Sequence, residues 1–494
     1  MADPTGATPA TPAAAGESQA TAASAAVGAN GKGVVQEISL YEIRKKIYPR
    51  AVSGWFATWR WALVWFTMVL FYGLPWLSWN DRQAVLFDLE ARRFFIFGIV
   101  LNPQDFIYLT GLLVISALAL FLFTAVAGRL WCGYACPQTV YTEIFLWIEA
   151  KIEGNRNQRI KLDNAPMSGG KFGRKAAKHA VWILFALWTG FTFVGYFTPV
   201  TELAGQVITA ALGPWQTFWI LFYGFATYGN AGFMREQVCK YMCPYARFQS
   251  AMFDKDTLII TYDEARGEPR GKRGRKADPA ALGLGSCIDC GLCVEVCPTG
   301  IDIRKGLQYE CIGCAGCVDA CNQVMDKMGY ERGLIRYDTT HGVQNKWSRS
   351  KLLARVLRPR VLIYTTILFA IAVALLTHVL TRVPLKVDVI RDRGALARIV
   401  EDGLIENVFR LQVINSAEIS RRYTITVGGL EGIRLDSDSH FTVDPAANRL
   451  VPVRVRAMPQ AGHPGSNTIE FTITADDDPN VRRVESASFF MPRQ

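Results

Sequence analysis

Histidine is scarce in this sequence, with five residues among 494, and the last 173 residues contain no cysteine. Two histidines, His179 and His378, lie in or beside apolar runs. The apolar runs described below are predicted to cross a membrane, and the two histidines would lie at its opposite faces. They therefore cannot hold one haem between them. The twelve cysteines are grouped rather than spread through small modules, which argues against a disulfide scaffold. No Gly-x-Gly-x-x-Gly motif opens a helix after a strand pattern, so no nicotinamide or flavin domain is expected.

Apolar runs dominate the chain, half of which is hydrophobic. Several nearly uncharged runs reach about 20 residues, which is the length that a helix needs to cross a bilayer. They predict an α-helical polytopic membrane protein with five transmembrane helices. The predicted spans are about 58–79, 107–128, 180–200, 212–234 and 361–383.

Positive charge is concentrated between particular spans, in a chain with 54 Lys and Arg against 43 Asp and Glu. Nine basic residues lie in 129–179, none lies in 201–211, and region 235–360 includes a basic run over 266–276. Because basic loops stay on the cytoplasmic side, we predict a multi-pass protein of the bacterial inner membrane. Its N-terminus and both basic regions are cytoplasmic, and its C-terminal domain is periplasmic. Loops of this kind explain the charge without nucleic acid as a partner, and we expect the basic run to be a solvated linker.

Five regions follow from these patterns. Residues 1–37 lack large apolar side chains and are predicted to be a disordered cytoplasmic tail. Residues 38–254 form a four-helix transmembrane region, 255–360 a cytoplasmic ferredoxin-like domain, and 361–383 the fifth span. Residues 384–494 alternate apolar and polar side chains in short segments, which predicts a periplasmic immunoglobulin-like β-sandwich.

Eight cysteines form a doubled motif, CIDCGLCVEVCP at 287–298 and CIGCAGCVDAC at 311–321. Each has the spacing of bacterial ferredoxins with two [4Fe–4S] clusters, in which the fourth cysteine of a motif binds the other cluster. The first-cluster cysteines are therefore Cys287, Cys290, Cys293 and Cys321, and the second-cluster cysteines are Cys311, Cys314, Cys317 and Cys297. Structural zinc also uses Cys-x2-Cys pairs, but the doubled spacing disfavours it. The motif predicts one-electron transfer.

The other four cysteines form two Cys-x3-Cys-Pro motifs, with Cys132 and Cys136 in the first and Cys239 and Cys243 in the second. Each motif follows a predicted span, which indicates an internal repeat. The proline either disfavours helix at the second cysteine or begins a new helix. In the latter case Cys136 and Cys243 lie at helix N-termini, where a thiolate is favoured. Basic residues nearby favour the thiolate further; they are Arg129, Arg235, Lys240 and Arg247.

Three interpretations of these four cysteines stay open. If the repeat brings the two pairs together, the soft sulfur ligands would select Cu(I). In the second interpretation, the same four thiols hold a third iron–sulfur cluster. In the third interpretation, the four thiols are buried, bind no ligand and pack as small hydrophobic groups.

The combined pattern resembles the CcoG, RdxA or FixG family of cytochrome c oxidase accessory proteins. The likeness covers about residues 38–494 and rests on CGYACPQTVYTEIF, CKYMCPYARFQSAMFD, the doubled ferredoxin motif and the sandwich tail. NapH- and NosR-type membrane ferredoxins share the Cys-x3-Cys-Pro part, whereas the sandwich tail and the NPQDF stretch at 102–106 favour the first family. Asn322 is a departure, because the second ferredoxin motif often has proline there.

The resemblance implies a role in maturation of the cbb3-type haem–copper oxidase, through reduction of Cu(II) to Cu(I). By carry-over, Cys132, Cys136, Cys239 and Cys243 would bind or reduce copper. The implied partners are the cbb3-type oxidase subunits or copper chaperones and transporters, together with an electron donor that the sequence does not name. Two alternatives stay open: a quinol-linked membrane ferredoxin subunit of a reductase, and an assembly scaffold whose clusters are structural.

Overall fold

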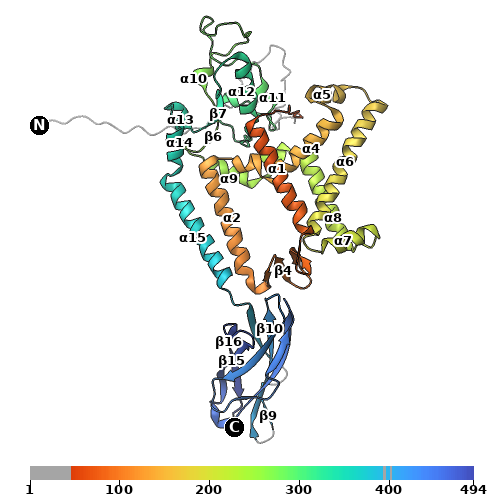
Figure 1. The fold of residues 1–494 in the computed structure, drawn as a ribbon, viewed down its shortest axis with the longest axis vertical. Coiled ribbons are helices and arrows are strands. Elements are labelled where there is room, and N and C mark those ends of the chain that lie inside the picture. The colour runs from red at the N-terminus through yellow and green to blue at the C-terminus, as the bar shows by residue number, and fades with distance from the viewer. Residues whose placement is uncertain (1–45, 393–395, 401–402, 494) are drawn as a thin grey trace, which may run out of the picture. The chain divides into compact units, whose positions relative to one another are not determined.

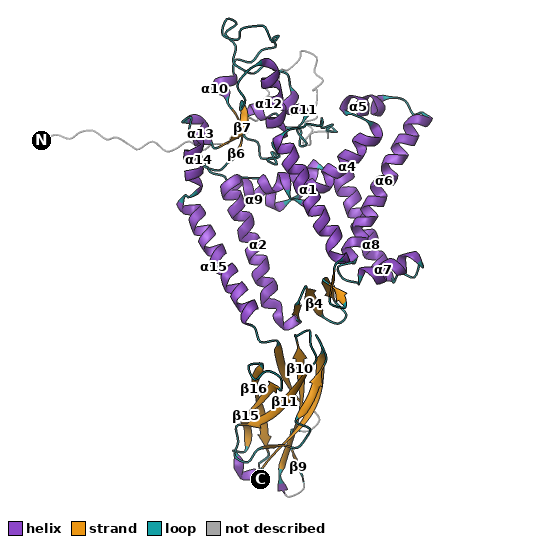
Figure 2. Cartoon of the chain, viewed as in Figure 1, coloured by secondary structure: helices purple, strands orange, loops and turns teal. Residues whose placement is uncertain are grey.

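The computed structural model describes residues 46–392, 396–400 and 403–493. The chain divides into two units, residues 1–46 and 47–494, and every element below belongs to the second. Figures 1 and 2 show that helices make up most of its first part and that strands make up its C-terminal part. The tail predicted over 1–37 lies outside the described residues.

The helical region runs from α1 to α9, and several of its helices begin where the sequence favours a helix start. Proline is the first residue of α4, α8 and α9, where its missing N–H costs no hydrogen bond. The helices are α1 (Trp55–Gly73), α2 (Phe106–Ala127), α3 (Leu130–Tyr134), α4 (Pro137–Glu153), α5 (Arg156–Asn164), α6 (Gly169–Val194), α7 (Val200–Ile208), α8 (Pro214–Thr227) and α9 (Pro244–Met252), with π-helical turns at Tyr228–Met234 and Val238–Met242.

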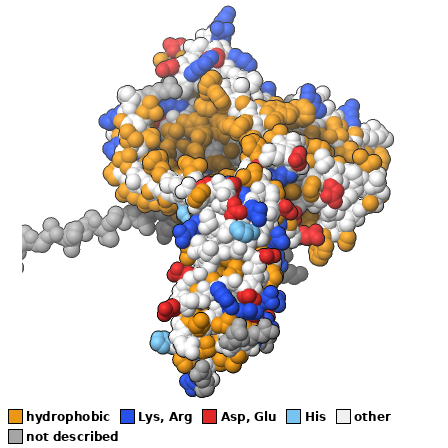
Figure 3. Space-filling view, turned by 60° about the horizontal axis from the view of Figure 1, so that its bottom comes forward, with side chains coloured by type: hydrophobic (Ala, Val, Ile, Leu, Met, Phe, Trp, Pro, Cys, Tyr) orange, Lys and Arg blue, Asp and Glu red, His pale blue; other side chains and the backbone are white. Residues whose placement is uncertain are grey.

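Three helices in the described part of the chain are long and apolar enough to cross a membrane: Pro103–Ala127, Gly169–Val194 and Pro359–Thr381, the last being α15. They match the second, third and fifth predicted spans. Hydrophobic side chains also gather over the helical surface in Figure 3, whereas the sandwich surface carries many charges. These observations support membrane association. The first and fourth spans stay predictions, because α1 carries the buried Arg60 and α8 has only 14 residues.

A small strand region, which the sequence patterns do not predict, connects α1 with α2. The first span was expected to reach residue 79, but α1 ends at Gly73 and a turn containing Pro75 follows. Proline lacks the N–H that continues a helix, so the chain leaves the helical path there. The strands are β1 (Ser78–Trp79), β2 (Arg82–Gln83), β3 (Val85–Asp88), β4 (Arg93–Ile96) and β5 (Ile99–Leu101), and the last three form an antiparallel sheet.

The ferredoxin-like region folds around the doubled cysteine motif. Its strands β6 (Ile259–Tyr262) and β7 (Ile335–Asp338) pair antiparallel from either side of that motif. Apolar side chains such as Met325 and Leu334 pack with the cysteines in one core. The helices of this region are α10 (Glu264–Gly267), α11 (Leu292–Glu295), α12 (Gly316–Met328), α13 (Thr340–Gln344) and α14 (Arg349–Val356).

Strands β8 to β16 form the predicted β-sandwich. One sheet has the order β12-β14-β10-β8 with β9 on β10, and the other has the order β13-β11-β15-β16. Alternate side chains, among them Phe409, Val453 and Phe471, are buried between the sheets. The sequence alternation did not predict β9, β12 or β16. The strands are β8 (Leu385–Arg391), β9 (Arg398–Ile399), β10 (Ile405–Asn415), β11 (Arg421–Gly428), β12 (Arg434–Leu435), β13 (His440–Val443), β14 (Asn448–Ala457), β15 (Gly465–Ala475) and β16 (Arg482–Met491).

The NPQDF stretch begins α2 and contacts the start of the sandwich. The Asn102 backbone N–H donates to Asp105 Oδ2 at 2.9 Å, which satisfies a helix-terminal donor. The Asn102 side-chain amide donates to Ser416 Oγ at 3.2 Å, and Asp105 pairs with Lys386 of β8. The motif therefore has a structural role that its letters alone do not reveal.

Candidate functional site

The four first-cluster cysteines line one cavity. Cys293 lies in α11 and Cys321 enters from α12, while Cys287 and Cys290 precede α11. Most of the remaining wall is apolar, with Arg304 at one side. Four thiols that converge in an apolar shell are the donor set that a [4Fe–4S] cluster requires.

The second-cluster cysteines line a separate cavity. Three come from the second motif, and Cys297 comes from the end of the first. Cys293 lines this cavity as well as the first one, so the two cavities adjoin. The geometry groups the eight cysteines as the spacing predicts, and their ligation of iron stays a prediction.

Left-handed backbone turns shape both cavities in the same way. Asp289 and Gly291 have φ values of 51° and 72°, and the equivalent Gly313 and Ala315 have 67° and 58°. Alternation of right- and left-handed residues turns successive N–H groups toward one point, a concavity found at many iron–sulfur sites. Ala315 carries a side chain at a position where glycine is favoured, so the turn there is set by the surrounding fold.

Burial dominates the chemistry of these thiols. It raises the pKa of Cys293 to about 11 and of Cys311 and Cys321 to about 12. Without iron these groups are protonated at neutral pH, whereas a coordinating thiol is deprotonated by the charge of its metal. Two cations partly offset the burial: Arg304 lowers the pKa of Cys293, and Arg60 lowers that of Cys314. The cavities therefore suit thiolates that are bound to a metal.

The two Cys-x3-Cys-Pro motifs have similar local structures. Cys132 lies in the short helix α3, and Cys239 lies in the π-helical turn Val238–Met242. Cys136 and Cys243 cap α4 and α9, each of which begins at the following proline. Of the two possibilities for these prolines, the structure therefore shows that each begins a new helix. All four thiols are half-buried.

The four thiols lie near one another. Burial raises the pKa of Cys132 to about 12 and of Cys239 to about 11, and neighbouring thiols add to both shifts: Cys136 and Cys239 for the first, Cys136 and Cys243 for the second. The expected stabilisation of a thiolate at Cys136 is wrong for the metal-free protein, because burial raises its pKa despite N–H donors from α4. Within the described residues, no three His, Cys, Asp or Glu side chains are close enough to hold one metal ion, and this holds for the ferredoxin cysteines as well.

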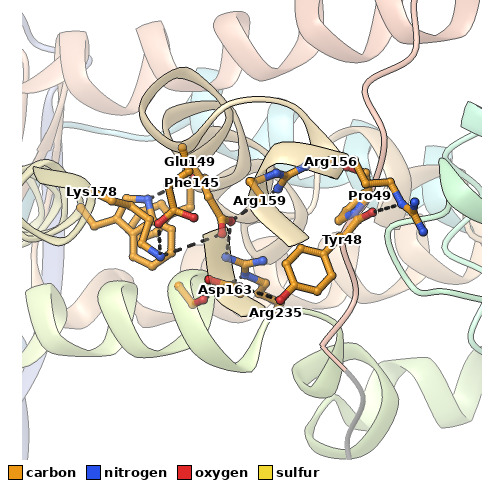
Figure 4. Close-up of polar contacts among 12 residues, drawn as sticks. Tyr48, Pro49, Phe145, Glu149, Arg156, Arg159, Asp163, Lys178 and Arg235 are labelled. Carbon is orange, nitrogen blue, oxygen red and sulfur yellow. Dashed lines mark hydrogen bonds and ion pairs between the residues drawn. The ribbon is translucent and has the colours of Figure 1, made fainter. Parts of the chain in front are cut away.

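A buried ionic network joins the two motifs (Figure 4). Glu149 of α4, which follows the first motif, pairs with Arg235, which precedes the second, at 2.7 Å. Arg159 approaches the same carboxylate at 3.7 Å, and Lys178 pairs with Glu153 at 3.0 Å. Both carboxylates are at most 1% exposed. Charges buried this deeply are retained only when they are paired, so the network fixes Arg235 and the adjoining second motif against α4.

The first Cys-x3-Cys-Pro motif packs directly on the loop of the second cluster. A Cβ atom on Gly133 would lie 2.9 Å from the backbone N and Cα of Cys314, so only glycine permits this approach. The Tyr337 hydroxyl donates to the Gly313 carbonyl at 2.5 Å, and the Tyr134 hydroxyl lies close to that of Tyr337. Cys132 and Cys136 thus lie on either side of a residue in contact with a second-cluster ligand.

The sequence patterns do not predict two residues that position the ferredoxin-like region and its first cysteine motif. Asp319 of α12 accepts a hydrogen bond from the Ala57 N–H at 2.8 Å and so caps α1 from the ferredoxin-like region. Arg273 donates to the carbonyls of Gly285 at 2.6 Å and Cys287 at 3.2 Å. The basic run is therefore more than a solvated linker, because one of its side chains holds the loop before the first motif. The one sequence signal for Asp319 is its position, as a carboxylate between two predicted cysteine ligands of the second motif.

Comparison with known proteins shows similarity along most of the chain. The nitrogen fixation protein FixG of Rhizobium meliloti (strain 1021) is 36% identical, over 92% of this chain and 94% of its own length. Proteins RdxA and RdxB of Cereibacter sphaeroides are 39% and 40% identical, over 89% and 87% of this chain and 95% and 92% of their own lengths. The chain belongs to the FixG/RdxA family. The resemblance stated from the motifs is therefore confirmed.

Matches to protein families divide this FixG/RdxA chain into parts. Residues 234–340 match a 4Fe-4S dicluster domain, and residues 375–492 match the IG-like fold at the C-terminal of FixG, putative oxidoreductase. Both the iron–sulfur character and the immunoglobulin-like domain are thus confirmed. Residues 109–155 match a 4Fe-4S binding domain. That stretch contains Cys132 and Cys136 but none of the eight ferredoxin cysteines.

Proposed function

We propose that this FixG/RdxA protein is a membrane-bound iron–sulfur oxidoreductase that reduces Cu(II) to Cu(I) at its Cys-x3-Cys-Pro cysteines. The contact of Gly133 with the Cys314 backbone carries this proposal. It joins a predicted cluster ligand to the peptide segment that bears Cys132 and Cys136. Electrons therefore have a short path between the two kinds of cysteine site.

The chemistry of the four thiols fits copper as a substrate. When bound, each [4Fe–4S] cluster supplies one electron, and Cu(II) needs one electron to become Cu(I). Soft thiolates retain Cu(I) better than Cu(II). Because Cys132 and Cys239 are protonated at neutral pH, copper binding must displace their protons.

The biological role we propose is supply of Cu(I) for assembly of a cbb3-type cytochrome c oxidase. Oxidase subunits, copper chaperones or copper transporters would receive the ion, with the β-sandwich as their docking module. We place the N-terminus and both clusters in the cytoplasm and the sandwich in the periplasm, on the loop charges. Protease added to intact spheroplasts should remove a tag on the sandwich and spare one on the N-terminus; the reverse pattern would overturn this orientation.

Anaerobic copper reduction tests the activity. Protein reduced with dithionite and freed of excess reductant is mixed with Cu(II) and a Cu(I) chelator, while cluster absorbance is followed. Rapid reoxidation with one Cu(I) per electron is expected, and it should be lost when the four Cys-x3-Cys-Pro cysteines are changed to Ser. Met242→Leu, an exposed neighbour, is the matched control. Equal rates in all proteins would mean that copper oxidises exposed clusters directly.

A third iron–sulfur cluster is the second candidate for these cysteines, because residues 109–155 match a 4Fe-4S binding domain. The two candidates differ in iron content. Two [4Fe–4S] clusters give about eight irons per chain and three give about twelve. Quantification of iron and acid-labile sulfide in anaerobically purified protein decides between them.

The remaining alternatives differ in what they require of the clusters. In a quinol-linked reductase subunit, quinol would reduce the clusters and copper would not oxidise them. In a scaffold, variants without cluster ligands would still support oxidase assembly. Measurement of oxidase activity in cells that carry Cys314→Ser tests the scaffold: retained activity favours it, and lost activity favours electron transfer.

A further inference from the structure

A large cavity lies between α1, α4 and the ferredoxin-like region. It has a volume of about 410 Å³. Its walls are largely apolar and aromatic: Trp61 and Trp65 come from α1, Leu146 and Trp147 from α4, and Val296 and Pro298 from the first ferredoxin motif. An apolar cavity of this size with a few polar groups is typical of a small-molecule site.

The mouth of this cavity is suited to entry from a membrane. Trp65 is 60% exposed and Trp147 is 47% exposed, although both are large and apolar. Tryptophan is enriched where a protein meets the membrane–water interface. The neighbouring surface of α1 exposes Phe66 and Val69 as well. A hydrophobic molecule in the bilayer therefore has an apolar route to the cavity.

The polar groups of the cavity favour a neutral ligand over an anionic one. Every arginine in its lining already has a carboxylate partner. Arg60 pairs with Glu143, Arg50 with Glu295 at 3.4 Å, and Arg159 with Glu149 at 3.7 Å. A lipid phosphate would have to compete with these carboxylates, whereas a neutral ring with hydroxyl or carbonyl groups would hydrogen-bond beside them.

The inner end of the cavity adjoins the second cluster site. Val296 and Pro298, which line it, flank Cys297, a second-cluster cysteine. A smaller cavity shares Arg60, Glu143 and Pro298 with it and reaches Cys239. A redox-active ligand held here would lie beside the predicted acceptor of its electrons.

We propose that this cavity binds a membrane quinol and that the protein receives its electrons there. Oxidation of one quinol breaks two O–H bonds and releases two electrons and two protons. The two [4Fe–4S] clusters would take one electron each. Water at the open mouth of the cavity would accept both protons and carry them to solvent. This assigns an electron donor independently of whether copper is the final acceptor.

Binding of decylubiquinone to the full-length protein in lipid nanodiscs tests the site. Tryptophan fluorescence reports binding, because three tryptophans line the cavity. We expect saturable quenching with the native protein. Ala150→Phe places a ring into the cavity from α4 and should weaken binding by about tenfold or more. The matched control is Ala180→Phe, an exposed alanine of α6, with unchanged affinity. Trp65→Phe should lower the quenching amplitude, because it removes one of the three reporting tryptophans.

A second measurement follows reduction of the clusters by decylubiquinol under anaerobic conditions. Ala150→Phe should slow it by about tenfold or more, in line with its affinity, while full bleaching by dithionite shows that the variant keeps its clusters. Copper reduction by the dithionite-reduced variant should be unchanged, which separates this proposal from the proposed function. If the quenching does not saturate and is equal in the Ala150→Phe and Ala180→Phe proteins, decylubiquinone only partitions into lipid. That result would overturn the site. A phospholipid that decylubiquinone does not displace, seen by native mass spectrometry, would overturn it too.

Discussion

The two sets of cysteines differ in how completely the polypeptide organises them. The eight ferredoxin cysteines already line two cavities with the ligand sets that their spacing predicts. The four Cys-x3-Cys-Pro cysteines lie near one another and are all half-buried, in a short helix, in a π-helical turn and at two helix starts. The two cavities support clusters at the first set, and transient copper at the second set is our proposal.

The two sets also differ in what holds them in place. Local turns with left-handed residues shape the ferredoxin cavities. The second set depends on contacts between distant segments, chiefly the Glu149–Arg235 pair and the packing of Gly133 on Cys314. Substitutions should therefore separate loss of clusters from loss of copper chemistry.

Removal of one ligand from each set should have the largest effect. Cys314→Ser should lose the second cluster and reduce the iron content from about eight to about four per chain. Cys132→Ser should keep about eight irons and lose copper reduction. Iron analysis and electron paramagnetic resonance of the reduced proteins measure both. Loss of four irons from Cys132→Ser would instead assign a cluster to the Cys-x3-Cys-Pro motif.

Disruption of the buried ionic network should be the next largest effect. Glu149→Gln removes the negative charge that faces the buried cations of the network. It should therefore destabilise the helical region by about 3–5 kcal/mol. The control Glu202→Gln, on the exposed surface of α7, should change stability by no more than about 0.5 kcal/mol. Thermal unfolding followed by a thiol-reactive dye measures the difference. Equal melting temperatures would show that the network does not support the fold.

The raised pKa values predict slow alkylation of the metal-free thiols. With a pKa of about 11 rather than 9, Cys239 should react with iodoacetamide about a hundredfold more slowly at pH 8 than in the urea-unfolded chain. Its rate should rise with pH until about 11. The same shift makes the folded state lose stability as pH rises above about 9, because the folded thiol retains its proton longer. A rate that is already maximal at pH 8 would contradict the burial argument.

Interference with the contact between the two sets should have the smallest effect on stability. Gly133→Ala forces a methyl group against the Cys314 backbone and should cost about 1–3 kcal/mol. Copper reduction should slow while iron content stays unchanged. Gly205→Ala, in α7 with no atom within 4 Å of the added carbon, should be neutral or stabilising by up to about 1 kcal/mol. Equal copper reduction in both variants would remove Gly133 from the proposed path.

Features that depend on local sequence were predictable. Cysteine spacing indicated the two cavities, and the alternation of apolar residues indicated six of the sandwich strands, because both patterns are read over a few residues. The first span was set too long, since tryptophans continue past Gly73 while Pro75 ends the helix. The strands β1 to β5 were missed because each is at most four residues long.

Features that depend on distant partners were not predictable. Glu149 and Arg235 are 86 residues apart, and the Asp319 carboxylate caps a helix 262 residues earlier in the chain. No pattern in one sequence marks such pairs, because each residue alone is an ordinary charged side chain. The cavity that we propose as a quinol site likewise forms only where α1, α4 and the first ferredoxin motif meet.

By itself the sequence determined the chemistry available to this protein: thiols at cluster spacing, two proline-flanked cysteine pairs, apolar helices and an alternating β domain. These depend on residue type and short-range geometry, which the chain carries locally. Only the tertiary structure decided how the parts are connected. It brought the first cysteine pair against Cys314 and buried the charges that hold the second pair near it. Such contacts form because glycine permits close backbone approach and buried ions require partners, and both conditions are met only in the folded chain.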